Sequence, residues 1–291
     1  MKAKNSMQLK AFIKKKAAEN SISAQLVMQN YMLERLLERV SLSKYKHNLI
    51  LKGGFLISAI VGLDTRATMD LDTTIKGFDI NHETVRRIFE EIAAISIDDD
   101  IKFDVLNTSD IREGDDYPGI RVSLTANYPP LAVPLSVDVT TGDKITPREI
   151  EYSFKLLFDD RSIKIMAYNL ETVFAEKLET IISRGIANTR PRDFYDVYIL
   201  HQLRGYECDK VVLKSALMET ALKRKSIFVM AEYKTVLEKI AASEQMKGYW
   251  KKYQADFDYA KDIAFLEICH LIEQIFDEIG FQTIKPDLSV F

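Results

Sequence analysis

The feature that most constrains this chain is a Gly-Gly step at 53–54, followed by Asp70 and Asp72 with one leucine between them. Alternate side chains of a β-strand share one face, so the two aspartates are expected to point the same way, with Met69 and Leu71 in the core. Two carboxylates on one strand face suit a Mg²⁺ ion that also holds nucleotide phosphates. Glycines let a backbone approach those phosphates, and a following helix adds its N-terminal amides. The pattern is typical of a nucleotidyltransferase active site.

Composition limits the remaining possibilities. The chain has 291 residues, 47% hydrophobic and 29% charged, which is typical of a globular protein with one large or two ordinary domains. A net charge of −3 gives no overall preference for nucleic acid. Cys208 and Cys269 lack the spacing of a zinc site and are expected to be thiols in a reducing compartment. The N-terminus has no signal-peptide pattern and no apolar run has spanning length, so we expect a cytoplasmic protein without membrane contact.

The pattern of apolar residues changes twice along the chain. The first forty residues have helical spacing, with Ser21 and Ser23 as possible caps. A mixed region follows, and after Asn169 the pattern is helical up to an irregular tail near 284–286. In the mixed region we expect strands at 48–51, 69–75, 101–106, 120–128 and 133–140, one or two more within 152–165, and helices at 55–60 and 81–94.

These elements predict an α+β fold with a mixed sheet. We expect an N-terminal helical segment at 1–41, a core at 42–168 and a helical C-terminal domain at 169–291.

A third carboxylate supports the metal site. Asp138 lies in a strand-like run, on the face opposite Val137 and Val139. Three carboxylates on neighbouring strands can hold two Mg²⁺ ions, one on the triphosphate and one on an attacking hydroxyl. The alternative is that Asp138 is only a strand-edge residue near a turn at 142–143.

Lys177 interrupts an apolar helical stripe that contains Phe174 and Leu178. An ammonium there needs an anion, unless its stem lets it reach water. Asp193 and Asp196 share one face of the next helix, and we expect either of them, or the phosphates of a bound NTP, to supply that anion. We also expect Lys177→Ala to impair activity far more than stability.

Basic residues next to aromatic ones are a possible RNA contact. Lys251 and Lys252 lie between Trp250 and Tyr253, and such neighbours can stack bases and bind phosphate. Packing of Trp250 in the core is the favoured alternative.

Five segments in order resemble the motifs of the AbiEii/AbiGii toxin family. They are 52–56 (Lys-Gly-Gly-Phe-Leu), 66–72 (Arg-Ala-Thr-Met-Asp-Leu-Asp), 137–143, 171–177 (Glu-Thr-Val-Phe-Ala-Glu-Lys) and 192–196 (Arg-Asp-Phe-Tyr-Asp). The resemblance spans roughly residues 25–205, and its specificity lies in the ordered set.

The resemblance implies a DNA-polymerase-β-like nucleotidyltransferase core, an NTP substrate and a type IV toxin–antitoxin pairing in phage-defence abortive infection. It also implies Mg²⁺ as cofactor, an RNA acceptor such as tRNA, and a cognate antitoxin that acts without a stable complex.

Carried over to this sequence, the resemblance places the site residues in two groups. Asp70, Asp72, Lys177 and Asp193 are the expected catalytic residues, with Asp138 as a further metal ligand. Lys52, Gly53, Gly54, Arg66 and Thr68 are the expected nucleotide-binding residues. The family pattern has Lys before the aspartate of its last motif, where this chain has Arg192.

The sequence therefore predicts a Mg²⁺-dependent nucleotidyltransferase toxin. Two alternatives stay open, a nucleotide- or RNA-binding module that has lost transfer activity and a metal-dependent nuclease that uses the same carboxylates. The sequence contains no GxSxG, P-loop or HExxH pattern that would favour other chemistry.

Overall fold

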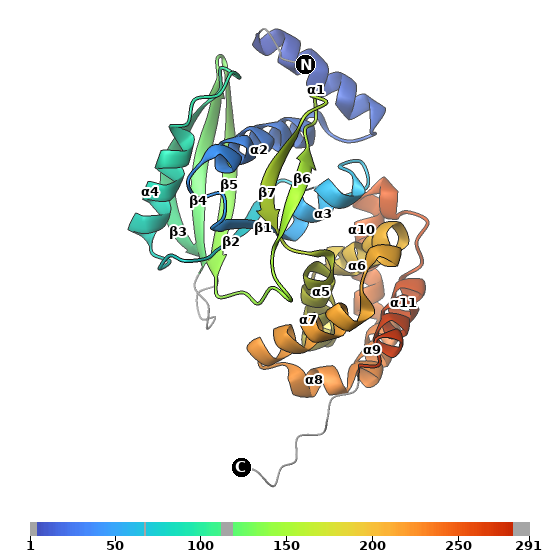
Figure 1. The fold of residues 1–291 in the computed structure, drawn as a ribbon. Helices are drawn as coiled ribbons and strands as arrows, with labels where there is room; N and C mark the ends of the chain where they lie inside the picture. The colour runs from blue at the N-terminus through green and yellow to red at the C-terminus, as the bar shows by residue number, and fades with distance from the viewer. Residues whose placement is uncertain (1–4, 67, 112–118, 282–291) are drawn as a thin grey trace. The chain divides into compact units, whose positions relative to one another are not determined.

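The computed structural model describes residues 5–66, 68–111 and 119–281, so the predicted irregular tail lies outside it. The chain forms two compact units (Figure 1). Unit 1 comprises Met1–Asp143 and Glu149–Tyr168, and unit 2 comprises Lys144–Arg148 and Asn169–Phe291. No helix of the described residues is both long and apolar enough to cross a bilayer.

Unit 1 is built on a seven-stranded mixed sheet with the order β3-β4-β5-β2-β1-β7-β6. β2 pairs parallel with β5, and β1 pairs parallel with β7, while the other neighbours are antiparallel. The strands are β1 Leu49–Lys52, β2 Leu71–Ile75, β3 Lys102–Ile111, β4 Gly119–Tyr128, β5 Leu131–Thr141, β6 Ile150–Lys155 and β7 Ser162–Ala167.

Among the described residues, four helices belong to unit 1, and three of them begin at side-chain caps. They are α1 Ser6–Glu19, α2 Ala24–Leu42, α3 Gly53–Val61 and α4 His82–Ala93. Asn5, Ser23 and Asn81 each accept a hydrogen bond from a first-turn amide of α1, α2 and α4. Of the possible caps Ser21 and Ser23, Ser23 is thus confirmed, whereas α3 starts at Gly53 without a side-chain cap among the described residues.

One face of the sheet is covered by α2 and α4. A small apolar cavity lies there between Leu37 of α2, Phe89 of α4 and the strand residues Leu51 and Leu71. Because side chains alternate along a strand, the residues next to Leu51 and Leu71 point to the other face. That second face carries the polar residues described below.

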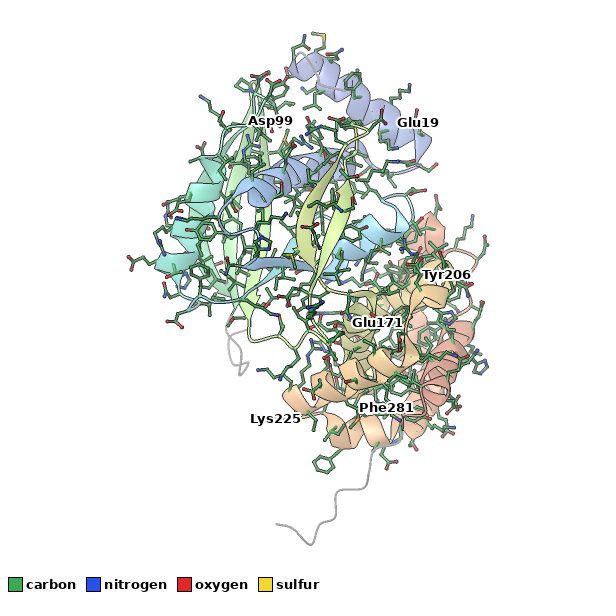
Figure 2. All side chains as sticks on the ribbon, in the orientation of Figure 1. Glu19, Asp99, Glu171, Tyr206, Lys225 and Phe281 are labelled. Atoms are coloured by element: carbon green, nitrogen blue, oxygen red, sulfur yellow. The ribbon has the colours of Figure 1, made fainter. Side chains whose placement is uncertain are left out.

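A buried ion pair fixes α2 to the connection between α4 and β3. Arg39 Nη1 and Nη2 donate to the two carboxylate oxygens of Asp99 at 2.8 and 2.9 Å. Both side chains are almost fully buried, and Arg39 also donates to the Ile101 carbonyl. Figure 2 labels Asp99, which lies shortly before the start of β3. The guanidinium and the carboxylate each have hydrogen-bond partners, and a buried charge is tolerated under that condition.

Unit 2 is helical. Its helices are α5 Leu170–Arg184, α6 Pro191–Arg204, α7 Lys210–Lys223, α8 Ile227–Ala231, α9 Tyr233–Ala242, α10 Glu244–Asp256 and α11 Phe265–Glu278, with short 3₁₀ turns at Gly185–Ala187, Gly205–Glu207 and Asp258–Ala260. An aromatic cluster forms part of its core, with Phe194 against Phe265 and Tyr195 against Tyr253 and Tyr259. Asn169 caps α5 through the Thr172 amide.

The α+β fold with a mixed sheet and a helical C-terminal half is confirmed. Several bounds differ from the expected ones. The strand expected at 101–106 extends to Ile111, the helix expected at 55–60 begins at Gly53, and the strand expected to start at Met69 begins at Leu71. Leu71 is buried as expected, but Met69 is 40% exposed. The alternation of a strand does not extend to a residue that precedes it.

Candidate active site

The chain turns sharply where β1 becomes α3. Gly53 has φ +66°, a conformation that residues with a Cβ adopt with strain. A Cβ built on Gly53 would lie 2.2 Å from Asp72 Oδ2. The Asp72 carboxylate therefore lies directly against the backbone that opens α3. Glycine is needed at position 53 for its conformation and for this contact.

Gly54 is the next close approach. A Cβ there would lie 3.0 Å from Arg66 Nη2 and 3.1 Å from Thr68 Oγ1. Arg66 is only 4% exposed, so its guanidinium is held beside the first turn of α3. The structure thus brings together Gly54, Arg66 and Thr68, which the sequence assigned to nucleotide binding.

Asn30 of α2 supports this segment, and sequence reasoning missed it. Its Nδ2 donates to the Thr68 carbonyl at 2.7 Å and to the Leu26 carbonyl at 3.0 Å. Asn30 is buried, and it lies one helical turn after Leu26 in the apolar stripe of α2. A polar residue in such a stripe needs a buried partner, which is the signal that could have found it.

Four charged residues form a row across four neighbouring strands. Lys52 of β1 pairs in register with Asp72 of β2, Asp72 with Asp138 of β5, and Asp138 with Arg121 of β4. Directly paired residues point to the same face of a sheet. From Lys52 to Arg121 the charges are positive, negative, negative and positive, and the row lies on the face opposite α2 and α4.

Lys52 is held inside the protein. It is 5% exposed, and its Nζ donates to Thr140 Oγ1 at 2.7 Å and to the Asp143 carboxylate. Burial would raise the pKa of Asp143, but the Lys52 charge and the hydrogen bonds from Lys52, Thr140 and Thr74 lower that pKa to about 2. The Lys52 charge is thereby offset by Asp143, and its assignment to the nucleotide site stays a prediction.

The three predicted metal ligands differ in their surroundings. Asp70 is exposed and immediately precedes β2, Asp72 of β2 is half-buried with its carboxylate against the turn into α3, and Asp138 is held by Arg121. Within the described residues, no group of three or more His, Cys, Asp or Glu side chains is gathered closely enough to hold a metal ion. Asp72 and Asp138 are nevertheless strand neighbours, with backbones about 4.8 Å apart. A metal shared by all three carboxylates stays a prediction.

The remaining predicted residues form a second cluster, within unit 2. Lys177 Nζ lies 2.7 Å from Asp193 Oδ1 and 2.8 Å from Asp196 Oδ2. Both aspartates are buried, and Asp193 lies in the first turn of α6, where the helix dipole favours a negative charge. The partners expected for Lys177 are therefore the observed ones. Asp193 Oδ2 is buried and has no hydrogen-bond partner among the described residues, whereas Arg192 is exposed.

The aromatic residues near Lys251 and Lys252 are packed inside unit 2. Trp250 is 2% and Tyr253 7% exposed, and Trp250 Nε1 donates to the Ile263 carbonyl at 2.9 Å. These rings are not available to stack RNA bases. The favoured alternative, packing of Trp250 in the core, is therefore confirmed.

The fold and the polar sheet face define a class, proteins with a nucleotidyltransferase fold. Two crystal structures from Helicobacter pylori, JHP933 and a provisional nucleotidyltransferase, each align with a TM-score of 0.50 and 13% identity over 89% of this chain. The alignments cover 94% and 98% of those chains, respectively. At this identity they show the fold alone. No curated protein matches the chain.

A sequence model of the AbiEii family, the nucleotidyl transferase AbiEii toxin of a Type IV TA system, matches residues 35–278. This match covers most of the chain, so the chain belongs to the AbiEii family. It is a nucleotidyltransferase, which implies a nucleotide substrate. It is also the toxin of a toxin–antitoxin system, which implies an antitoxin partner.

Proposed function

We propose that this enzyme transfers a nucleotide from a Mg²⁺-bound NTP to the end of a cellular RNA, with tRNA as acceptor, and thereby blocks translation during abortive infection. The observation that carries the proposal is the adjacent pair Asp72 and Asp138, beside the uncapped start of α3. The proposed reaction takes place in the cytoplasm, where NTP and tRNA are both available.

The donor set fits a hard divalent cation. Mg²⁺ prefers carboxylate oxygens and keeps several positions for water and phosphate, and Asp70, Asp72 and Asp138 would supply such oxygens. A bound Mg²⁺ would neutralise phosphate charge and lower the pKa of the attacking hydroxyl.

The chain's own residues would position the triphosphate. The turn at Gly53 and Gly54 lets phosphate oxygens approach the first amides of α3, which carry the positive end of the helix dipole. Arg66 and Thr68 border the same turn and would contribute a guanidinium and a hydroxyl. These groups would hold the α-phosphate for attack.

The transfer itself is a displacement at phosphorus. The acceptor hydroxyl oxygen forms a bond to the α-phosphorus, the bond from that phosphorus to the β-phosphate oxygen breaks, and pyrophosphate leaves. The hydroxyl proton passes to a carboxylate or to water. Lys177 is proposed to stabilise charge on the phosphates, and Asp193 to orient Lys177.

Purified protein incubated with each α-labelled NTP, Mg²⁺ and total cellular RNA tests the proposal. We expect label in RNA of tRNA length and release of pyrophosphate, with one NTP preferred. Bound NTP without pyrophosphate release would support the inactive binding module, and shortened RNA would support a nuclease.

The antitoxin is proposed to act without a stable complex. Co-expressed antitoxin should therefore elute separately from the toxin in size-exclusion chromatography, while still relieving toxicity. Co-elution at equal stoichiometry would contradict this part of the proposal.

A further inference from the structure

Arg121 is the one member of the charged row for which neither the family motifs nor the predicted site supplies a role. It lies on β4, directly opposite Asp138. Its Nε and Nη2 donate to Asp138 Oδ1 and Oδ2 at 2.7 and 2.8 Å. A guanidinium bound in this two-point geometry occupies both oxygens of the carboxylate.

The two ends of the row differ in how firmly their cations are held. Lys52 is buried and has Asp143 as its own counter-ion. The Arg121 side chain is 43% exposed, and Asp138 is 17% exposed. An ion pair with an exposed partner contributes little net stability, so its separation costs little. Arg121 is therefore the exchangeable cation of the two.

Arg121 also lies within the field of the other two predicted metal ligands. The pKa of Arg121 is raised, first by its hydrogen bonds to Asp138 and by the charge of Asp138, and further by the charges of Asp70 and Asp72. In the absence of a metal ion, its guanidinium offsets the repulsion between carboxylates on neighbouring strands. A divalent cation at Asp138 would also offset this repulsion between carboxylates, with twice the charge of Arg121.

Arg121 and a metal ion compete for the same side of the Asp138 carboxylate, because a two-point pair takes the syn lone pair of each oxygen and these are the lone pairs that metal ions prefer. A metal ion that takes one of these positions displaces at least one of the two hydrogen bonds. Any free energy that holds Arg121 on Asp138 is then subtracted from the affinity for the metal ion.

We propose that Arg121 withholds Asp138 from the metal site in the nucleotide-free enzyme, and that it leaves Asp138 when a divalent cation and the triphosphate bind. The released guanidinium then faces the negatively charged phosphates, which suit its planar fork of donors. Arg121 is thus a positioning residue, and this inference rests on the proposed function.

Binding of Mn²⁺ to the full chain, followed by electron paramagnetic resonance without nucleotide, tests the inference. The proteins are the wild type, Arg121→Gln, and Arg121→Gln combined with Asp138→Asn. We expect Arg121→Gln to bind Mn²⁺ up to about fivefold more tightly than the wild type, which is the change in affinity that an exposed ion pair can account for. The double variant should lose that gain, because the freed carboxylate is gone.

Arg86→Gln is the matched control. Arg86 is also 43% exposed and also forms an ion pair, with Glu90 of its own helix. It should leave Mn²⁺ affinity unchanged. Arg121→Lys, which keeps the charge but loses the two-point contact, should give an intermediate affinity and serves if Arg121→Gln fails to fold.

The two proposals fail differently. Unchanged or weaker Mn²⁺ binding by Arg121→Gln, in a preparation whose wild type incorporates label into RNA, overturns the role of Arg121 alone. A wild type that incorporates no label from any NTP overturns the proposed function instead. A gain that persists in the double variant would also contradict the inference, because it would not pass through Asp138.

Discussion

At the scale of single residues, Gly53 has the least freedom to change. Its φ of +66° and the 2.2 Å approach of a built Cβ to Asp72 Oδ2 both exclude a side chain. We expect Gly53→Ala to lower the stability of unit 1 by about 1–3 kcal/mol and to displace the Asp72 carboxylate, with loss of transfer. Thermal unfolding and label incorporation measure the two effects. Gly248→Ala, where a built Cβ meets nothing within 4 Å, should be neutral or slightly stabilising.

Lys177 shows how the contacts change an expectation drawn from sequence. The sequence favoured a Lys177→Ala variant that is inactive but stable. In the structure its removal leaves the buried Asp193 and Asp196 without their shared cation. Removing one partner of a buried ion pair costs about 3–5 kcal/mol. We therefore expect loss of stability as well as of activity, measured by denaturant unfolding.

A combined variant separates the two losses. Lys177→Met with Asp193→Asn and Asp196→Asn removes all three charges, and we expect it to regain stability but no transfer activity. Full activity of this variant would show that the cluster only supports the fold of unit 2. Lys234→Ala, which removes a surface pair with Asp277, should change neither property.

At the scale of elements, α2 carries a buried charge network that joins it to the turn between β6 and β7. Glu34 accepts hydrogen bonds from Arg35 and from the Leu157 amide, and Glu38 pairs with Arg35 and Arg161. Burial of Glu34, opposed by the charge of Arg35, raises its pKa from 4.5 to about 7. The carboxyl group of Glu34, which connects α2 to the turn between β6 and β7, therefore titrates near neutral pH.

The sign of the pH dependence follows from that shift. The folded state binds the Glu34 proton more tightly than the unfolded state, so its contribution is complete below the unfolded pKa and is lost as the pH rises through about 7. We expect the stability of the wild type, relative to Glu34→Gln, to fall by about 3 kcal/mol between about pH 4.5 and about pH 8. Denaturant unfolding at several pH values measures this. Parallel pH curves for wild type and Glu34→Gln would contradict it.

Most elements were predictable because their signals are local. Apolar periodicity and caps such as Ser23, Asn81 and Asn169 lie within a few residues of the helices they start. The pairing of Arg121 with Asp138 was not predictable, because it depends on the register of two strands. The beginning of β2 at Leu71 was missed for a similar reason, since strand pairing decides where a strand begins.

At the scale of the whole molecule, the sequence reached the fold class and the family because its motifs occur in a fixed order. It predicted the carboxylates but not what surrounds them, since the partners of Asn30 and Lys52, which are Thr68 and Asp143, leave no spacing pattern. Side-chain partners that come from distant segments need coordinates. The site residues are accordingly a prediction from sequence, and the structure adds the counter-ions that surround them.

The central claim is that Asp72 holds the metal ion through which an NTP gives up its nucleotide. Incorporation of label from NTP into cellular RNA by Asp72→Asn, beside the wild type and the exposed control Asp79→Asn, tests it most directly. We expect Asp72→Asn to lose transfer by more than a hundredfold while its thermal unfolding stays close to that of the wild type, because a charged ligand and not a packing residue is removed. Asp79→Asn should keep full activity. Near-normal incorporation by Asp72→Asn would contradict the account.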